Sequence, residues 1–277
     1  MQQWQFDRIV RGWTVLLGIF SMGCHGSIPI DSAFNPNLPS VNEPLIIHCD
    51  FVLPQQSRLV DQLVQQRSVL SEKLNLTLTS EPVHIYLFAD EQAYYQFLSR
   101  QFPDFPPRRA LFVETDTQLA IYAFWGSHVI EDLRHEVTHG YLHGSGFLYG
   151  SKGQLPLWLD EGLAEYFEVG RSYQGLHKKH AAFLQQQYLA SSWHPNLARL
   201  ESLQSASKMT QQDYAESWAW VHFLLETSPE RQSLLGQYFA DLRNSPTNDA
   251  LSHRISKQLV RADLTLLEHL QILWGEE

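Results

Sequence analysis

The sequence changes character near Trp125, and this change restricts the fold more than any other feature. Before Trp125, short β-branched and aromatic runs alternate with amphipathic segments, a pattern typical of strands mixed with helices. Beyond it, the periodic segments favour helix. We therefore predict an α+β protein, in which a small, mostly antiparallel sheet with helices packs on a C-terminal helical bundle.

The expected elements follow from the same patterns. Strands are predicted at 45–52, 83–88, 110–113 and 118–124. Helices are predicted at 54–74, 90–98, 129–143, 157–169, 177–189, 210–226, 229–242 and 262–273. Three prolines make 102–109 a loop, and the four residues from Glu114 to Thr117 are a plausible hairpin connection.

The first 24 residues resemble a secretory signal, because two arginines precede the apolar stretch 13–22. That stretch is too short to span a bilayer as a helix, which needs ~20 residues. It ends in Gly-Cys, which resembles a bacterial lipoprotein signal and implies lipidation of Cys24. Ser21 and Asp7 depart from that pattern, so an ordinary signal or an apolar segment without a targeting role are the alternatives. We expect an exported protein, either periplasmic or anchored to a membrane by a lipid on Cys24.

Two further segments follow the signal. Residues 25–43 are rich in Pro, Ser and Asn without periodicity, which is typical of a linker. The folded domain is predicted at 44–277, with a sheet-containing part at 44–125 and a helical part at 126–277.

Composition excludes some classes of function. With 44% hydrophobic and 18% charged residues, the chain is globular rather than disordered. The formal net charge is -10, and no basic run or basic helix face stands out, so we expect no nucleic-acid partner. Two cysteines, Cys24 and Cys49, cannot build a disulfide framework. Nothing in the sequence indicates the oligomeric state.

The motif that carries chemistry is His-Glu-x-x-His, from His135 through Glu136 to His139. Histidines four apart on a helix lie ~40° apart around the axis and ~6 Å apart along it, so both reach one ion. Glu136 is rotated ~100° from His135 and lies beside the ion without occupying a ligand position. From there it can take a proton from a metal-activated water.

A second predicted helix begins at Leu157 and offers the carboxylate of Glu161. The loop before it contains several glycines and a proline, which let the chain reverse and return the second helix alongside the first.

Here the sequence resembles the gluzincin zinc metallopeptidases, a thermolysin-like and aminopeptidase-like superfamily. The likeness is closest to an uncharacterised bacterial branch with a compact peptidase-MA-like domain, and it is good over about 119–167. The motifs that carry it are His135-Glu136-x-x-His139 and Trp158-Leu159-x-Glu161-Gly162-x-Ala164-x-Tyr166.

The resemblance implies a zinc peptidase acting on a peptide or protein substrate. It implies one Zn²⁺ held by His135, His139 and Glu161, with Glu136 as the general base. An endopeptidase is mildly preferred over an aminopeptidase, because no amine-anchoring motif precedes the helix that carries His135 and His139. The alternative is a peptidase fold that keeps zinc but only binds a peptide or protein, and an intact Glu136 argues against it.

Further roles are carried over by position in the motifs. Glu165 falls where some relatives place an acid that orients the first histidine, and Asp160, a further candidate behind the ligands, stands where many relatives have Asn. An exposed carboxylate is an equal alternative for Glu165. Tyr214 is the candidate donor to the developing oxyanion, and an aromatic residue packed on a helix face is the alternative. Strand 119–124 resembles the edge strand that binds extended substrate in relatives, and an ordinary strand within the sheet is the alternative.

Other histidines are weaker candidates as ligands. His143 continues the helical spacing and competes with Glu161 as the third ligand, although a cap or surface role is favoured. The metzincin pattern fails, because Leu142 and Ser145 stand where Gly and His are required. We expect His177 and His180 to be structural, since neither has a partner at ligand spacing.

Overall fold

The computed structural model describes residues 40–42, 44–103, 107–115, 117–147, 155–244 and 249–275. The predicted signal, including Cys24, lies outside the described residues. Within the described ranges, no helix is both long and apolar enough to cross a membrane.

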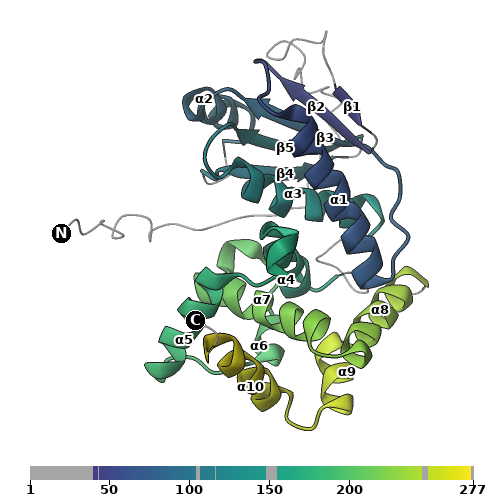
Figure 1. Ribbon diagram of the computed structural model, residues 1–277, viewed down its shortest axis with the longest axis vertical. Coiled ribbons are helices and arrows are strands. Elements are labelled where there is room, and N and C mark those ends of the chain that lie inside the picture. The colour runs from purple at the N-terminus through teal and green to yellow at the C-terminus, as the bar shows by residue number, and fades with distance from the viewer. Residues whose placement is uncertain are drawn as a thin grey trace, which may run out of the picture.

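The predicted α+β class is confirmed by one sheet and a set of packed helices (Figure 1). The strands are β1 Ser40–Asn42, β2 Leu45–Cys49, β3 Val83–Phe88, β4 Ala110–Glu114 and β5 Leu119–Phe124. Their order across the sheet is β1-β2-β3-β5-β4. Strand β1 forms within the predicted linker 25–43 and pairs with β2.

The sheet is mixed, so the prediction of mostly antiparallel pairing was wrong. Strands β2, β3 and β5 run parallel, and only the outer pairs β1–β2 and β4–β5 are antiparallel. The reason is connectivity. Helix α1 between β2 and β3 returns the chain in the same direction, whereas α2 leads into β4, which runs opposite to β3, and the β4–β5 hairpin then reverses the chain so that β5 is parallel to β3.

The helices agree with the predicted ones to within a few residues at each end. They are α1 Gln56–Leu74, α2 Glu91–Gln101, α3 Val129–Gly144, α4 Leu157–Glu168, α5 Lys178–Leu189, α7 Gln211–Glu226, α8 Pro229–Asn244 and α10 Ala262–Gly275. Two short helices, α6 Leu197–Glu201 and α9 Leu251–Gln258, and two 3-10 turns, Arg171–Tyr173 and Ala206–Lys208, were not predicted.

The sheet is covered on both faces. Along β3, Val83, Ile85 and Leu87 point into the main core, which also contains residues of α1 and α3. Tyr86 and Phe88 point to the opposite face, where α2 covers them. Alternation along a strand produces this division, and burial on both faces is typical of parallel strands.

Helix α3 lies between the sheet and the lower helical part of the molecule, where it meets α4 (Figure 1). Two glycines permit the close packing. A Cβ on Gly140 of α3 would lie 3.0 Å from Val83 of the sheet, and one on Gly162 of α4 would lie 2.6 Å from the Ser217 carbonyl oxygen of α7. Helices α3 and α4 are thus held against rigid neighbours, which positions the side chains that they direct at each other.

Candidate metal centre

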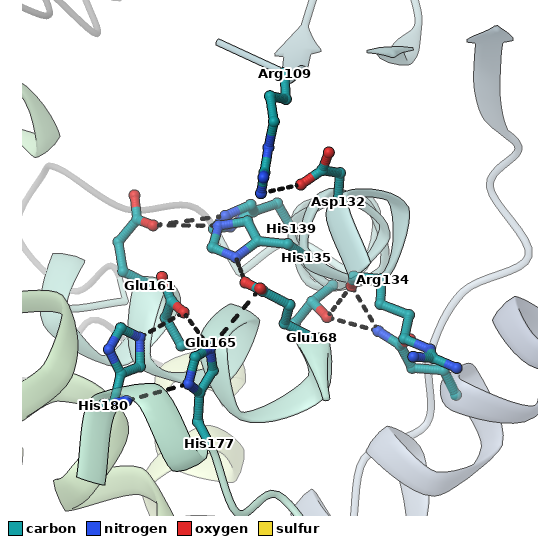
Figure 2. Close-up of polar contacts among 12 residues, drawn as sticks. Arg109, Asp132, Arg134, His135, His139, Glu161, Glu165, Glu168, His177 and His180 are labelled. Atoms are coloured by element: carbon teal, nitrogen blue, oxygen red, sulfur yellow. Dashed lines mark hydrogen bonds and ion pairs between the residues drawn. The ribbon is translucent and has the colours of Figure 1, made fainter. Parts of the chain in front are cut away.

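Helices α3 and α4 bring together the three predicted ligands. His135 and His139 lie one turn apart on α3, with ring centroids 5.1 Å apart. The Oε2 atom of Glu161 lies 3.6 Å from Nε2 of His135 and 3.8 Å from Nε2 of His139 (Figure 2). All three side chains are largely buried, and one ligand atom from each lies within 4.8 Å of the others.

The spacing of these atoms fits a metal ion. Ligands bound tetrahedrally to zinc at ~2.0–2.1 Å are roughly 3.3–3.4 Å apart. The separations of 3.6 and 3.8 Å therefore require shifts of only a few tenths of an ångström. This buried His/Glu group could hold a metal ion.

The electrostatics of the group also favour a cation. Burial acts to lower the pKa of His135, but the carboxylates of Glu161 and Glu168 outweigh it and raise that pKa well above its usual value. Burial acts to raise the pKa of Glu161, and His135 and His139 lower it instead. The carboxylates thus favour positive charge at the histidines, which a bound metal ion would supply in place of protons.

The second nitrogen of each ligand histidine faces a carboxylate. Nδ1 of His139 lies 3.1 Å from Oδ2 of Asp160, and Nδ1 of His135 lies 3.3 Å from Oε2 of Glu168. An imidazole that donates its Nδ1–H to a carboxylate keeps Nε2 free for a metal. Asp160 thus faces the second nitrogen of His139.

The carboxylate at Nδ1 of His135 belongs to Glu168, whereas the sequence suggested Glu165 for this orienting role. Glu168 follows Glu161 by seven residues, two helical turns, so helical spacing alone could have identified it. Glu165 remains near His135, but its closest contact is with His180 of α5, at 2.8 Å between Oε2 and Nε2. It is a buried residue rather than an exposed one.

His143 is buried, and it is neither a helix cap nor a surface residue. Its Nδ1 lies 2.9 Å from Oε2 of Glu114, and its Nε2 lies 3.4 Å from Oδ2 of Asp160. Burial acts to lower the pKa of His143, but Asp160 and Glu114 raise it to about 9. With a carboxylate at each nitrogen, His143 has a structural partner on both sides. It also forms a ligand-like group with His139 and Asp160.

The two possible third ligands differ in what surrounds them. Glu161 faces the Nε2 atoms of both His135 and His139. The Nε2 atom of His143 instead faces Asp160, the carboxylate that contacts Nδ1 of His139. The geometry therefore favours Glu161 over His143 as the third ligand.

A cleft of about 360 Å³ opens beside the ligands. Its lining includes Glu136, Tyr214 and Arg108 together with His135 and Glu161. The Arg108 guanidinium donates a hydrogen bond to the Tyr214 hydroxyl. Burial and the nearby Glu161 carboxylate raise the pKa of Tyr214, which keeps its hydroxyl protonated at neutral pH. Arg108 was not singled out from the sequence, because it lies in a proline-rich loop without any motif.

The predicted edge strand 119–124 is not at an edge. Strand β5 lies between β3 and β4, and β4 is the outer strand on this side of the sheet. The hairpin folds so that its second strand pairs with β3, which moves the first strand outward. Arg109 and Ala110, where β4 begins, line the cleft.

Comparison with known proteins covers part of the chain. Residues 129–246, less than half of the chain, match the model of a family described as "Protein of unknown function (DUF1570)". The match begins at the first residue of α3 and includes α4, so it contains the candidate ligands but none of the strands. No curated protein matches the chain. The fold and site define an α+β protein with a buried His/Glu group suited to a metal ion.

Proposed function

We propose that the protein is a zinc-dependent peptidase with one Zn²⁺ held by His135, His139 and Glu161. The observation that carries the proposal is the convergence of both histidine Nε2 atoms on one Glu161 oxygen at the wall of an open cleft. Two imidazoles and a carboxylate are the ligand set of catalytic zinc sites that keep a fourth position open.

A bound Zn²⁺ supplies Lewis acidity and lowers the pKa of a water ligand. Glu136 lines the same cleft, and its carboxylate takes the proton of the attacking water and delivers it to the leaving amine. Tyr214 remains protonated and donates a hydrogen bond to the oxygen of the scissile carbonyl as negative charge develops there. Arg108, bonded to Tyr214, adds positive charge at that oxygen.

The outer strand β4 supports a preference for extended peptides. An extended substrate can add to an exposed strand edge through main-chain hydrogen bonds, and β4 begins at the wall of the cleft. Such binding places a peptide bond, rather than a chain terminus, near the metal ligands. This favours an endopeptidase.

The test compares the full chain with Glu136→Gln and with Glu91→Gln, a matched variant of an exposed carboxylate on α2. A quenched fluorescent peptide library reports cleavage, and elemental analysis reports zinc. We expect Glu136→Gln to keep its zinc and to lose roughly 10²–10⁴-fold in kcat/KM, the usual contribution of a general base. Glu91→Gln should match the wild type. Zinc-loaded wild-type protein that binds peptides without cleaving any would instead support a non-catalytic binding module.

We further propose that the chain is exported and carries a lipid on Cys24. The apolar stretch ending in Gly-Cys supports this proposal. Mass spectrometry of protein from a bacterial membrane fraction should show a lipidated N-terminal cysteine, and Cys24→Ser should abolish it. A wild-type chain that retains its first residues, or is cut elsewhere, would refute the lipid anchor.

A further inference from the structure

A second cluster of ligand-type side chains lies beside the first, behind α4. It consists of Glu165 on α4 with His177 and His180 at the start of α5. Oε2 of Glu165 lies 2.8 Å from Nε2 of His180 and 3.7 Å from Nε2 of His177. The two imidazole rings stack with centroids 3.9 Å apart, so both Nε2 atoms approach the same carboxylate oxygen (Figure 2).

The cluster is buried and rich in negative charge. Glu165 and His177 are 9% and 7% exposed, and His180 is half-buried. Glu161, Glu165 and Glu168 follow each other along one face of α4, where like charges three or four residues apart repel. Burying a carboxylate is costly unless a cation or hydrogen-bond donors compensate it. When an ion is bound by His135, His139 and Glu161, the Glu165 carboxylate still faces the His177 and His180 imidazoles, and the hydrogen bond to His180 is its shortest contact.

We propose that Glu165, His177 and His180 form a second metal site, separate from the site of His135, His139 and Glu161. One ligand atom from each residue lies within 4.8 Å of the others, the same criterion that the first group meets. Two imidazoles with a carboxylate suit a divalent transition metal such as Zn²⁺, Mn²⁺, Fe²⁺ or Co²⁺, and disfavour Ca²⁺ and Mg²⁺, which prefer oxygen ligands alone.

Glu168 lies between the two sites, as Figure 2 shows. Its Oε2 is 3.3 Å from Nδ1 of His135, and its Oε1 is 3.8 Å from Nε2 of His177. One carboxylate therefore contacts a ligand of each site. A cation in the second site would be coupled to the first through this shared carboxylate.

Metal binding at the second site gives up two hydrogen bonds. Nδ1 of His177 accepts a hydrogen bond from the backbone N–H of His180 at 3.3 Å, which places the imidazole proton on Nε2. Coordination through Nε2 displaces that proton and gives up this long hydrogen bond. The contacts of His177 Nε2 with Glu165 and Glu168, at 3.7 and 3.8 Å, are too long for hydrogen bonds. Coordination through Nε2 of His180 also gives up its hydrogen bond to Oε2 of Glu165, at 2.8 Å.

The experiment counts metal ions in the full chain. Chelator-treated wild type, His180→Ala and His139→Ala are titrated with Zn²⁺ by calorimetry, and elemental analysis after gel filtration checks the stoichiometry. His253→Ala is the matched control, because His253 is exposed and distant in sequence from both clusters. We expect two equivalents in the wild type and the control, and one in each of the other two variants.

The outcomes separate the two sites. A single equivalent that His139→Ala loses and His180→Ala keeps would overturn the second site and leave the proposed peptidase centre standing. A single equivalent with the opposite pattern would support the second site and overturn the first. Glu165→Gln, which preserves side-chain shape, serves as a second variant if His180→Ala unfolds.

Discussion

The close packing of α4 against α7 at Gly162 determines where the neighbouring metal-ligand candidate Glu161 lies. Gly162 adjoins Glu161 on α4, where α4 meets α7. A Cβ added at Gly162 would lie 2.6 Å from the carbonyl oxygen and 2.8 Å from the carbonyl carbon of Ser217, and 2.9 Å from Cγ2 of Val221. Two of these three atoms belong to the backbone of a buried helix, so a rotamer change cannot relieve the contact.

The magnitude of the effect of Gly162→Ala follows from these distances. Ordinary contact begins at 3.4 Å, so α4 and α7 must separate by about 0.8 Å. Overpacking of this kind costs ~1–3 kcal/mol, and alanine returns up to ~1 kcal/mol through its higher helix propensity. We expect a net loss of roughly 1–2 kcal/mol in the free energy of unfolding. Metal–ligand distances tolerate only about ±0.2 Å, so a shift of Glu161 by a comparable amount should also weaken zinc binding.

Urea unfolding of the metal-free protein measures the loss of stability, and competition with a chromogenic chelator measures zinc affinity. Gly275→Ala is the matched control, because a Cβ there meets no atom within 4 Å. We expect the control to leave both quantities almost unchanged. A Gly162→Ala protein as stable as the wild type, with the same zinc affinity, would refute the packing argument.

Three other perturbations test the remaining contacts. Glu168→Gln removes the charge facing a ligand histidine and should weaken zinc binding roughly 10–100-fold in chelator competition; unchanged affinity would contradict the role of Glu168. Tyr214→Phe should lower kcat by roughly 10²–10³-fold with zinc content unchanged, and full activity would exclude Tyr214 as the oxyanion donor. Burial lowers the pKa of His222 to about 3 and that of His269 to about 4, and their imidazoles hydrogen-bond each other with Nδ1 and Nε2 3.0 Å apart. Because both folded pKa values lie below the unfolded value of about 6.5, the pair's contribution to stability is present above that pH and is lost as the pH falls toward 4. His269→Gln should reduce the dependence of unfolding free energy on pH in that window by up to ~1.4 kcal/mol per pH unit, and an unchanged slope would contradict this.

Local periodicity was sufficient to predict most helices and the arrangement of residues within each of them. The spacing of His135 and His139 on one helix determines that both project from one face, whatever packs against it. Hydrogen bonds between residues four apart fix this geometry within a single segment. The same reasoning placed Glu161 on a second helix, and the glycine-containing loop indicated that the two helices lie side by side.

The sequence alone did not determine relations between segments. Strand β5 pairs with β3 and therefore lies inside the sheet rather than at its edge. The hydrophobic pattern of a strand shows which of its faces is buried, but it does not show which strand lies next to it. The meeting of Glu114 with His143, and of Glu165 with His180, joins residues from separate elements. These contacts arise from helix and sheet packing, so only the tertiary structure shows which carboxylate contacts which histidine.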